Sequence, residues 1–172
     1  MLGPFLFLGD RKWTVRGVTY GTFAADPSGD LFPPRDAVRA DFAQMRRAHV
    51  DAVRTYTPPP DWLFEEARAA GLRILVGIHW EGRGCDFDDP RTFRAAEAAV
   101  RVAVARCRRF PDVVLAYAIA NEIPPLTVRF HGSRVIERFL RRLYRVAKSE
   151  DPEGLVTYAN YPTTEFLDLG FL

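Results

Sequence analysis

The dipeptide Asn121-Glu122 directly follows an apolar stretch, residues 113–120. We expect that stretch to be a buried strand, which places the pair at a strand end. A carboxyl group held there with little water around it has a raised pKa and can protonate a leaving oxygen near neutral pH. The neighbouring amide can hydrogen-bond a sugar hydroxyl. A plainer interpretation, in which Glu122 accepts from a nearby backbone amide in a loop, stays open.

Polar and aromatic residues also stand at the ends of the other expected strands. They are Tyr20, Arg54, Tyr56, His79, Trp80, Glu81, Tyr158, Asn160 and Tyr161. Such residues at the carboxyl end of every strand are typical of the active face of a (β/α)8 barrel. Each also has a structural interpretation: Arg54 can pair with a loop acid, and His79 can be a satisfied core histidine.

Alternating apolar segments and helical patterns give these residues their positions. Strands are expected at 16–20, 52–56, 72–80, 113–120 and 155–160, with a hairpin of 5–8 and 12–16 before them. Four long helices are expected between the strands. Asp61 and Asp89 are the expected N-caps of two of them, and another helix is expected to start at Ser133. Residues 166–172 suggest a short helix and the approach to another strand.

This alternation predicts βαβ units around a parallel sheet. A (β/α)8 barrel typically needs about 250 residues, and this chain has 172. We therefore expect an α/β fold, a partial (β/α)8 TIM barrel of about five parallel strands with flanking helices and an N-terminal hairpin. It forms one truncated domain over 1–172, with the hairpin at 5–16 and strand–helix units over 16–172.

Composition excludes several classes of protein. With 48% hydrophobic and 27% charged residues, the chain is neither disordered nor fibrous. Its net charge of +2 comes from interspersed signs, so we expect no nucleic-acid partner. No apolar run approaches the roughly 18 residues of a membrane helix, and no signal peptide is evident; we expect a cytoplasmic protein with no membrane partner.

The same reading disfavours cofactors. Tyr20-Gly21-Thr22 is not a Gly-rich phosphate turn, which argues against a dinucleotide- or phosphate-binding α/β enzyme. Cys85 and Cys107 lack metal-ligand or redox spacing, and no histidine–acid cluster has metal-ligand spacing. We expect no metal and no cofactor, a buried free thiol at Cys107, and structural or exposed histidines at His49 and His131.

The strand-end segments together resemble clan A of the glycoside hydrolases, which holds cellulases, mannanases, beta-galactosidases and beta-glucuronidases. The segments are Arg16-Gly17-Val18-Thr19-Tyr20, Val53-Arg54-Thr55-Tyr56, Ile78-His79-Trp80 and Ala120-Asn121-Glu122. The resemblance runs from about residue 5 to the end of the chain. It implies the N-terminal portion of a retaining glycosidase barrel acting on O-glycosidic bonds of oligo- or polysaccharides.

The resemblance also implies roles for individual residues. Glu122 would be the general acid/base, and Asn121 would bind the sugar's 2-hydroxyl. Arg54 would lie beside the nucleophile and keep it ionised. His79 would line the sugar subsite. The candidates for stacking on sugar faces are Trp80, Tyr158 and Tyr161.

The second carboxylate of a retaining enzyme is missing from this pattern. In the clan it lies at the end of the seventh strand, beyond the five expected here. Glu81 can at most imitate it, and Glu165 is expected to begin a helix. We therefore expect little or no glycosidase activity from these 172 residues. Two alternatives stay open: an inactive carbohydrate-binding or scaffold half-barrel that self-associates, and a sugar-active domain attached to a glycosyltransferase.

Overall fold

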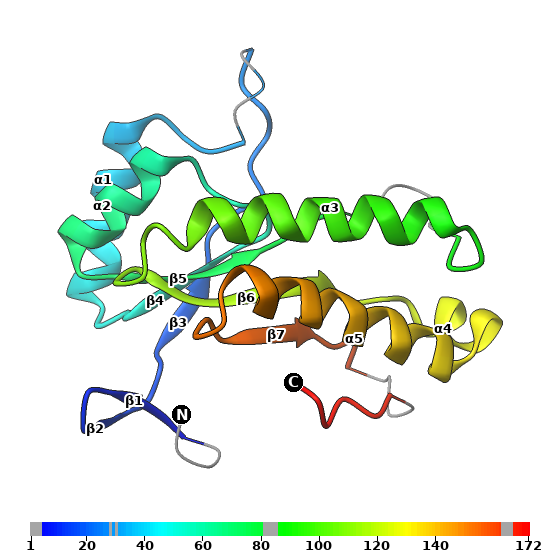
Figure 1. Cartoon of the computed structure of the whole chain (residues 1–172). Coiled ribbons are helices and arrows are strands. Elements are labelled where there is room, and N and C mark those ends of the chain that lie inside the picture. Colours follow the sequence, from blue (N-terminus) through cyan, green and yellow to red (C-terminus); the bar gives the residue numbers. More distant parts are fainter. Residues whose placement is uncertain (1–4, 28, 30, 81–85, 163–166) are drawn as a thin grey trace.

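The computed structural model describes residues 5–27, 29, 31–80, 86–162 and 167–172. A five-stranded parallel sheet forms its centre, with strand order β3-β4-β5-β6-β7 (Figure 1). The strands are β3 (Gly17–Thr19), β4 (Ala52–Thr55), β5 (Arg73–Gly77), β6 (Val114–Asn121) and β7 (Val156–Ala159). The antiparallel hairpin of β1 (Leu6–Leu8) and β2 (Arg11–Trp13) stands apart from this sheet. The expected hairpin and five parallel strands are confirmed.

Helices follow the strands in the predicted alternation. They are α1 (Arg35–Arg47), α2 (Asp61–Ala70), α3 (Pro90–Cys107), α4 (Pro125–His131) and α5 (Ser133–Glu150). Because the strand order follows the chain and parallel crossovers are right-handed, the crossover helices cover one face of the sheet. A doubly wound sheet would instead reverse its strand order. The fold is therefore a partial TIM barrel.

Three helix starts differ in how closely they match expectation. The side chain of Asp89 accepts a hydrogen bond from the backbone N–H of Arg91 at 2.8 Å, so it caps α3 as predicted. Asp61 is not an N-cap: Pro60 precedes α2 and Asp61 is its first residue, where its carboxylate accepts from Arg109 at 2.7 Å. The short helix α4 was not expected.

The apolar core lies between the sheet and the helices. Among its largest fully buried side chains are Phe42, Phe64, Ile74, Tyr117 and Phe139. Removing each such side chain from water stabilises the fold by roughly 1.5–3 kcal/mol.

A further sequence expectation about burial is confirmed. Cys107 is a buried free thiol whose pKa is raised by burial to about 11. The arginines of α5 form an exposed face, namely Arg134, Arg138, Arg141, Arg142 and Arg145.

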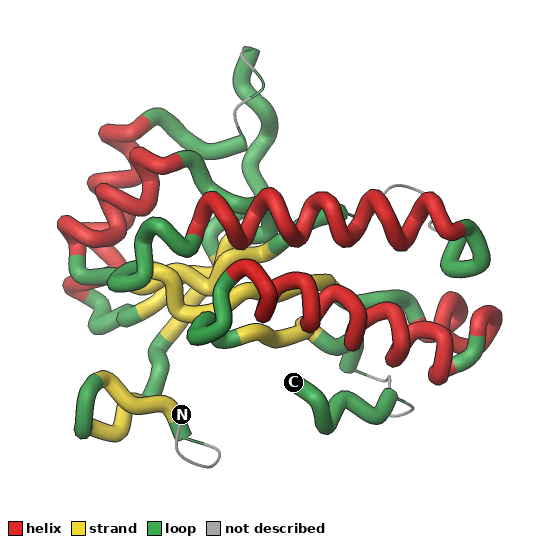
Figure 2. Tube along the Cα trace, viewed as in Figure 1, coloured by secondary structure: helices red, strands yellow, loops and turns green. Residues whose placement is uncertain are grey.

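The C-terminal segment differs from the prediction of a short helix and a strand. Residues 167–172 form neither (Figure 2), and 163–166 lie outside the described residues. The segment packs against α5 instead. The ring of Phe171 lies 5.8 Å from the ring of Tyr144, and the guanidinium of Arg141 lies 4.4 Å from the centroid of the Phe171 ring. Its alternating apolar residues cover a helix, which explains why they resemble a strand in sequence.

A charged cluster joins α1 to α2. The carboxylate of Glu66, whose side chain is 6% exposed, accepts from Arg35 at 2.6 Å and from Arg39 at 3.0 Å. Hydrogen bonds from Arg39 and Arg35 hold the pKa of Glu66 at about 2, below its ordinary 4.5. The ionised carboxylate is therefore favoured in the folded chain.

Gly77, at the end of β5, is packed against the end of β4. A Cβ added there would lie 2.3 Å from the carbonyl oxygen of Thr55 and 2.7 Å from that of Tyr56. The two strand ends approach this closely because residue 77 has no side chain.

No helix in the described parts of the chain is long and apolar enough to cross a membrane.

We expect Gly77→Ala to destabilise the chain by about 3 kcal/mol, because backbone atoms of β4 must move to admit the methyl group. Gly17→Ala is the matched control: its Cβ would meet the Ala52 carbonyl oxygen at 3.3 Å. That control should change stability by about 1 kcal/mol or less. Urea unfolding followed by circular dichroism measures both, and equal effects would contradict the close approach at Gly77.

We expect acid to remove the contribution of Glu66 to the free energy of unfolding. Because its pKa is lowered on folding, this contribution is present above its ordinary pKa of 4.5 and is lost as pH falls toward about 2. The unfolding midpoint of the wild type should therefore fall more steeply over that range than that of Glu66→Gln. Glu65→Gln, at a carboxylate that is 54% exposed, is the control and should keep the wild-type slope. Parallel profiles for wild type and Glu66→Gln would refute the role of the cluster.

Candidate functional site at the carboxyl edge of the sheet

Arg54 and Asn121 meet at the carboxyl edge of the sheet, although β5 lies between their strands. A guanidinium N–H (Nη2) of Arg54 donates to the Asn121 side-chain oxygen. The guanidinium also lies 4.9 Å from the ring centroid of Tyr56. Its Nε is buried and has no hydrogen-bond partner in the described parts of the chain. The guanidinium thus orients the amide and keeps one donor for a further acceptor.

A pocket of about 250 Å³ surrounds this contact. Its lining includes three small residues, Gly77, Ala118 and Ala120. The remaining lining residues are Thr22, Arg54, Tyr56, Thr57, Ile78, His79 and Asn121. The structure therefore brings three of the predicted site residues, Arg54, His79 and Asn121, to one pocket.

Glu122 follows Asn121 in an unusual backbone conformation, with φ of +44°. This left-handed region is uncommon for residues other than glycine and is frequent at functional sites. The backbone N–H of Glu122 donates to the carbonyl oxygen of Ala159 in β7 at 2.8 Å. Its side chain is exposed. The described residues therefore fix its backbone but do not supply the dry surroundings that we expected for a proton donor.

Tyr158 holds the other side of Glu122. Its hydroxyl accepts a hydrogen bond from the backbone N–H of Ile123 at 3.0 Å, and Tyr158 is only 7% exposed. We had expected a side chain that stacks on sugar faces. The buried ring and its bond to the backbone argue instead that Tyr158 positions Glu122 from β7.

Trp80 is half-buried and packs against the core. Its indole N–H donates to the carbonyl oxygen of Ile119 in β6 at 2.6 Å. Its ring meets Phe139 edge-on at 4.8 Å and Phe87 at 6.3 Å. Trp80 therefore ties the chain after β5 to β6.

The other predicted residues are placed less specifically. His79 is exposed at the pocket, and Tyr161 is partly exposed just beyond β7. Tyr20 is buried, and its hydroxyl donates to Asp41 at 2.8 Å, a structural contact. Glu81 and Glu165 lie outside the described residues, so the structure places neither of them.

Sequence reasoning missed the residues that make room for the site. The sequence pattern placed Gly77, Ala118 and Ala120 in apolar strands, and nothing in their spacing indicated that they line a pocket. Thr22 and Thr57 line the same pocket without any motif. The available signal was a glycine inside a strand pattern, which often marks a close backbone approach.

Tyr158→Phe should leave the buried N–H of Ile123 without its acceptor. We expect a loss of about 1–2 kcal/mol in stability and faster hydrogen exchange at the Ile123 amide. Tyr161→Phe, which removes the hydroxyl from a partly exposed neighbour, is the control and should change neither. Amide exchange followed by NMR tests this, and an unchanged Ile123 rate in Tyr158→Phe would show that the hydroxyl does not hold this segment.

Comparison with solved structures supports this fold. No family model matches the chain, and no curated protein matches it in sequence. Among solved structures, it is similar to Bacteroides uniformis beta-glucuronidase 2 at 19% identity and a TM-score of 0.69, over 88% of this chain and 19% of that one. An exo-beta-1,4-mannosidase from Opitutaceae bacterium strain TAV5 gives 15% identity and a TM-score of 0.70, over 87% and 32% of the two chains.

A beta-glucuronidase from Ruminococcus gnavus is also similar, at 18% identity and a TM-score of 0.66, over 87% of this chain and 25% of that one. The chain thus spans a third or less of the length of these three glycosidases. At such identities the likeness concerns the fold. The chain has the fold of part of the barrel of TIM-barrel glycosidases, as its resemblance to clan A implied.

Proposed function

We propose that this chain is the part of a retaining glycoside hydrolase barrel that carries the general acid/base, Glu122. The observation that carries the proposal is the contact between Arg54 and Asn121 in a pocket at the carboxyl edge of the sheet, with Glu122 next in the chain. The glycosidase fold of the structural neighbours supports it. The substrates proposed are carbohydrates joined by O-glycosidic bonds.

In the proposed reaction the glycosidic oxygen leaves as Glu122 gives it a proton. A second carboxylate attacks the anomeric carbon from the opposite face and forms a covalent glycosyl ester. Glu122, now ionised, takes a proton from water, and that water displaces the ester carboxylate. Asn121 accepts or donates a hydrogen bond at the 2-hydroxyl, where the interaction strengthens as positive charge develops on the ring.

Arg54 supports the second carboxylate in this scheme. Its guanidinium is half-buried, and its Nε lacks a hydrogen-bond partner among the described residues. A charge in such surroundings is stabilised by an anionic partner with good geometry. We assign that partner to the nucleophile, which the described residues do not identify. Residues His79 and Tyr56, which line the same pocket, would contact the sugar.

The exposure of Glu122 sets a requirement on the proposal. A proton donor that works near neutral pH is favoured by desolvation, and Glu122 is exposed in the described structure. In this proposal, polypeptide other than the described residues covers the carboxyl edge and supplies the nucleophile.

A second candidate is a non-catalytic carbohydrate-binding or scaffold module that self-associates. The open sheet favours it: β3 and β7 each pair on one side within the described residues, and Val18 on β3 is 41% exposed. The unpaired N–H and C=O groups of an edge strand are a template for pairing with another chain. Sedimentation separates the two candidates, because a monomer across micromolar concentrations would count against the self-associating module.

We expect no measurable hydrolysis of aryl beta-glycosides by the 172-residue chain, because the covalent step lacks its nucleophile. In any longer polypeptide that contains this chain and hydrolyses them, Glu122→Gln should lower kcat by about 10²- to 10⁴-fold. Asp36→Gln, at a residue whose side chain is 93% exposed on α1, is the control and should leave kcat unchanged.

The proposed acid/base role has a more specific signature in Glu122→Ala. With an activated leaving group, the first step needs no proton donor, and azide replaces the water that Glu122 would have deprotonated. Added azide should restore turnover and give a glycosyl azide. If the 172-residue chain hydrolyses these substrates and Glu122→Gln abolishes the activity, the inference that the chain lacks a nucleophile is wrong. If Glu122→Gln leaves kcat unchanged in a longer active enzyme, Glu122 is not the acid/base.

A further inference from the structure

Three potential metal ligands meet away from the pocket at the strand ends. Asp86 and Asp88 come from the loop before α3, and His131 is the last residue of α4. One ligand atom from each lies within 4.8 Å of the others. None of the three lines the pocket around Arg54 and Asn121. The cluster joins the loop after β5 to the loop after β6, on the side of the molecule where those strands end (Figure 1).

Packing around Phe87 fixes the loop that carries the two aspartates. Phe87 is 4% exposed, and its ring meets Phe139 at 5.0 Å and His131 at 5.5 Å, both edge-on. The backbone N–H of Asp88 donates to the carboxylate of Asp86 at 2.8 Å. The two carboxylates are thereby held on either side of an anchored aromatic residue and next to the imidazole.

The imidazole of His131 is directed at the same cluster with an unused nitrogen. Its side chain is 7% exposed, and its Nδ1 is buried with no hydrogen-bond partner in the described parts of the chain. Nδ1 lies 3.3 Å from a carboxylate oxygen of Asp88, without hydrogen-bond geometry. Nδ1 and the carboxylate oxygen are both electron-pair donors to metal ions, so a cation between them would bind both atoms.

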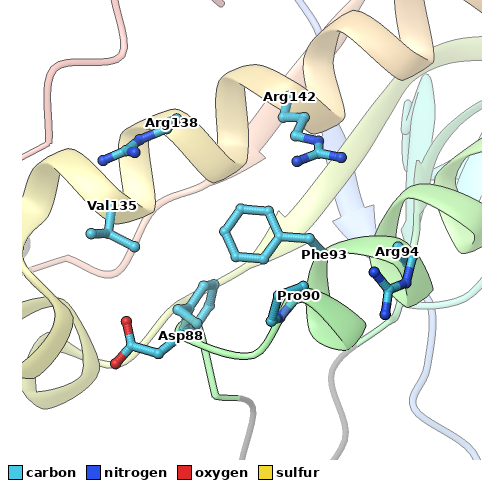
Figure 3. Close-up of a pocket in the computed structure, with 8 residues that line it drawn as sticks. Asp88, Pro90, Phe93, Arg94, Val135, Arg138 and Arg142 are labelled. Atoms are coloured by element: carbon cyan, nitrogen blue, oxygen red, sulfur yellow. The ribbon is translucent and has the colours of Figure 1, made fainter.

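The surrounding charges leave the carboxylates free for a cation. Within the described residues, neither Asp86 nor Asp88 forms an ion pair with a lysine or arginine. The groove of about 530 Å³ beside the cluster is lined by Asp88 together with Arg94, Arg138 and Arg142. Figure 3 shows the Asp88 carboxylate directed away from Arg94 and Arg142. Arg142 is engaged by Glu97 on α3.

We propose that Asp86, Asp88 and His131 bind a divalent transition metal ion, of which Zn²⁺ fits best. One imidazole nitrogen and two carboxylate oxygens are ligands that Zn²⁺ accepts at about 2.0–2.2 Å, whereas Mg²⁺ and Ca²⁺ prefer oxygen alone. Both aspartates are exposed and can rotate to close the remaining distance. Water would complete the coordination. The ion would join the loop before α3 to α4, and through α4 it would stiffen the segment after Glu122.

This site departs from our sequence expectation of no metal. Asp86 and Asp88 are close in sequence, but His131 lies one helix and one strand further on, so no ligand spacing is visible in the sequence. The fold alone brings the imidazole to the carboxylates.

Titration calorimetry of the 172-residue chain with Zn²⁺ tests the proposal, with Mg²⁺ and Ca²⁺ as comparison ions. We expect one Zn²⁺ per chain and no comparable binding of Mg²⁺ or Ca²⁺. Asp86→Asn and Asp88→Asn should each weaken Zn²⁺ binding by about tenfold or more. Asp36→Asn, at a remote residue whose side chain is 93% exposed, is the matched control and should bind as the wild type does.

His131→Gln should also lose Zn²⁺ binding, but its packing against Phe87 makes misfolding a competing explanation. The exposed aspartate variants avoid this difficulty, and circular dichroism verifies their folding. NMR of the imidazole nitrogens adds a direct readout: Zn²⁺ should shift Nδ1 of His131. Absence of Zn²⁺ binding would overturn the proposal, as would binding that is equal in wild type, Asp86→Asn and Asp88→Asn, or that shifts the imidazoles of His49 or His79 and leaves His131 unchanged.

Discussion

The contact between Arg54 and Asn121 spans three strands, and the rest of the site depends on it. Arg54 lies in β4 and Asn121 in β6, so its guanidinium must reach past the end of β5. Gly77 lies at that end of β5, where a Cβ would collide with the carbonyl oxygens of Thr55 and Tyr56. The absence of a side chain at residue 77 therefore sets the spacing of the β4 and β5 ends beside the pocket.

One face of the sheet packs in the core, and the other contributes residues to the pocket. The face toward the helices carries the buried core, including Ile74, Tyr117 and Ile119. Around the pocket, β6 contributes the small residues Ala118 and Ala120, which leave space for polar groups. Glu122 is then held from its neighbour β7, by the Ala159 carbonyl and the Tyr158 hydroxyl. An exposed carboxylate thus gains a fixed backbone without belonging to the core.

Sequence patterns predicted the elements better than the contacts. Period-2 and helical patterns are properties of nearby residues, so the hairpin, the five strands and the Asp89 cap could be recognised. The pairing of Arg54 with Asn121 and the close approach of Gly77 to β4 depend on strand register, which local patterns do not contain. The bond from Ile123 to Tyr158 was missed for the same reason. Residues 167–172 were misread because they cover α5 with the alternation of a strand.

We propose that a sugar binds at the carboxyl edge between Arg54 and Glu122. An NMR titration of the ¹⁵N-labelled chain with methyl beta-glucoside, a neutral pyranoside, tests this directly. We expect shifts of the backbone amides of Gly77, Asn121 and Ile123, and of the Arg54 side-chain N–H groups. Shifts confined to the β1–β2 hairpin or to the groove between α3 and α5, or no shifts at tens of millimolar sugar, would contradict it.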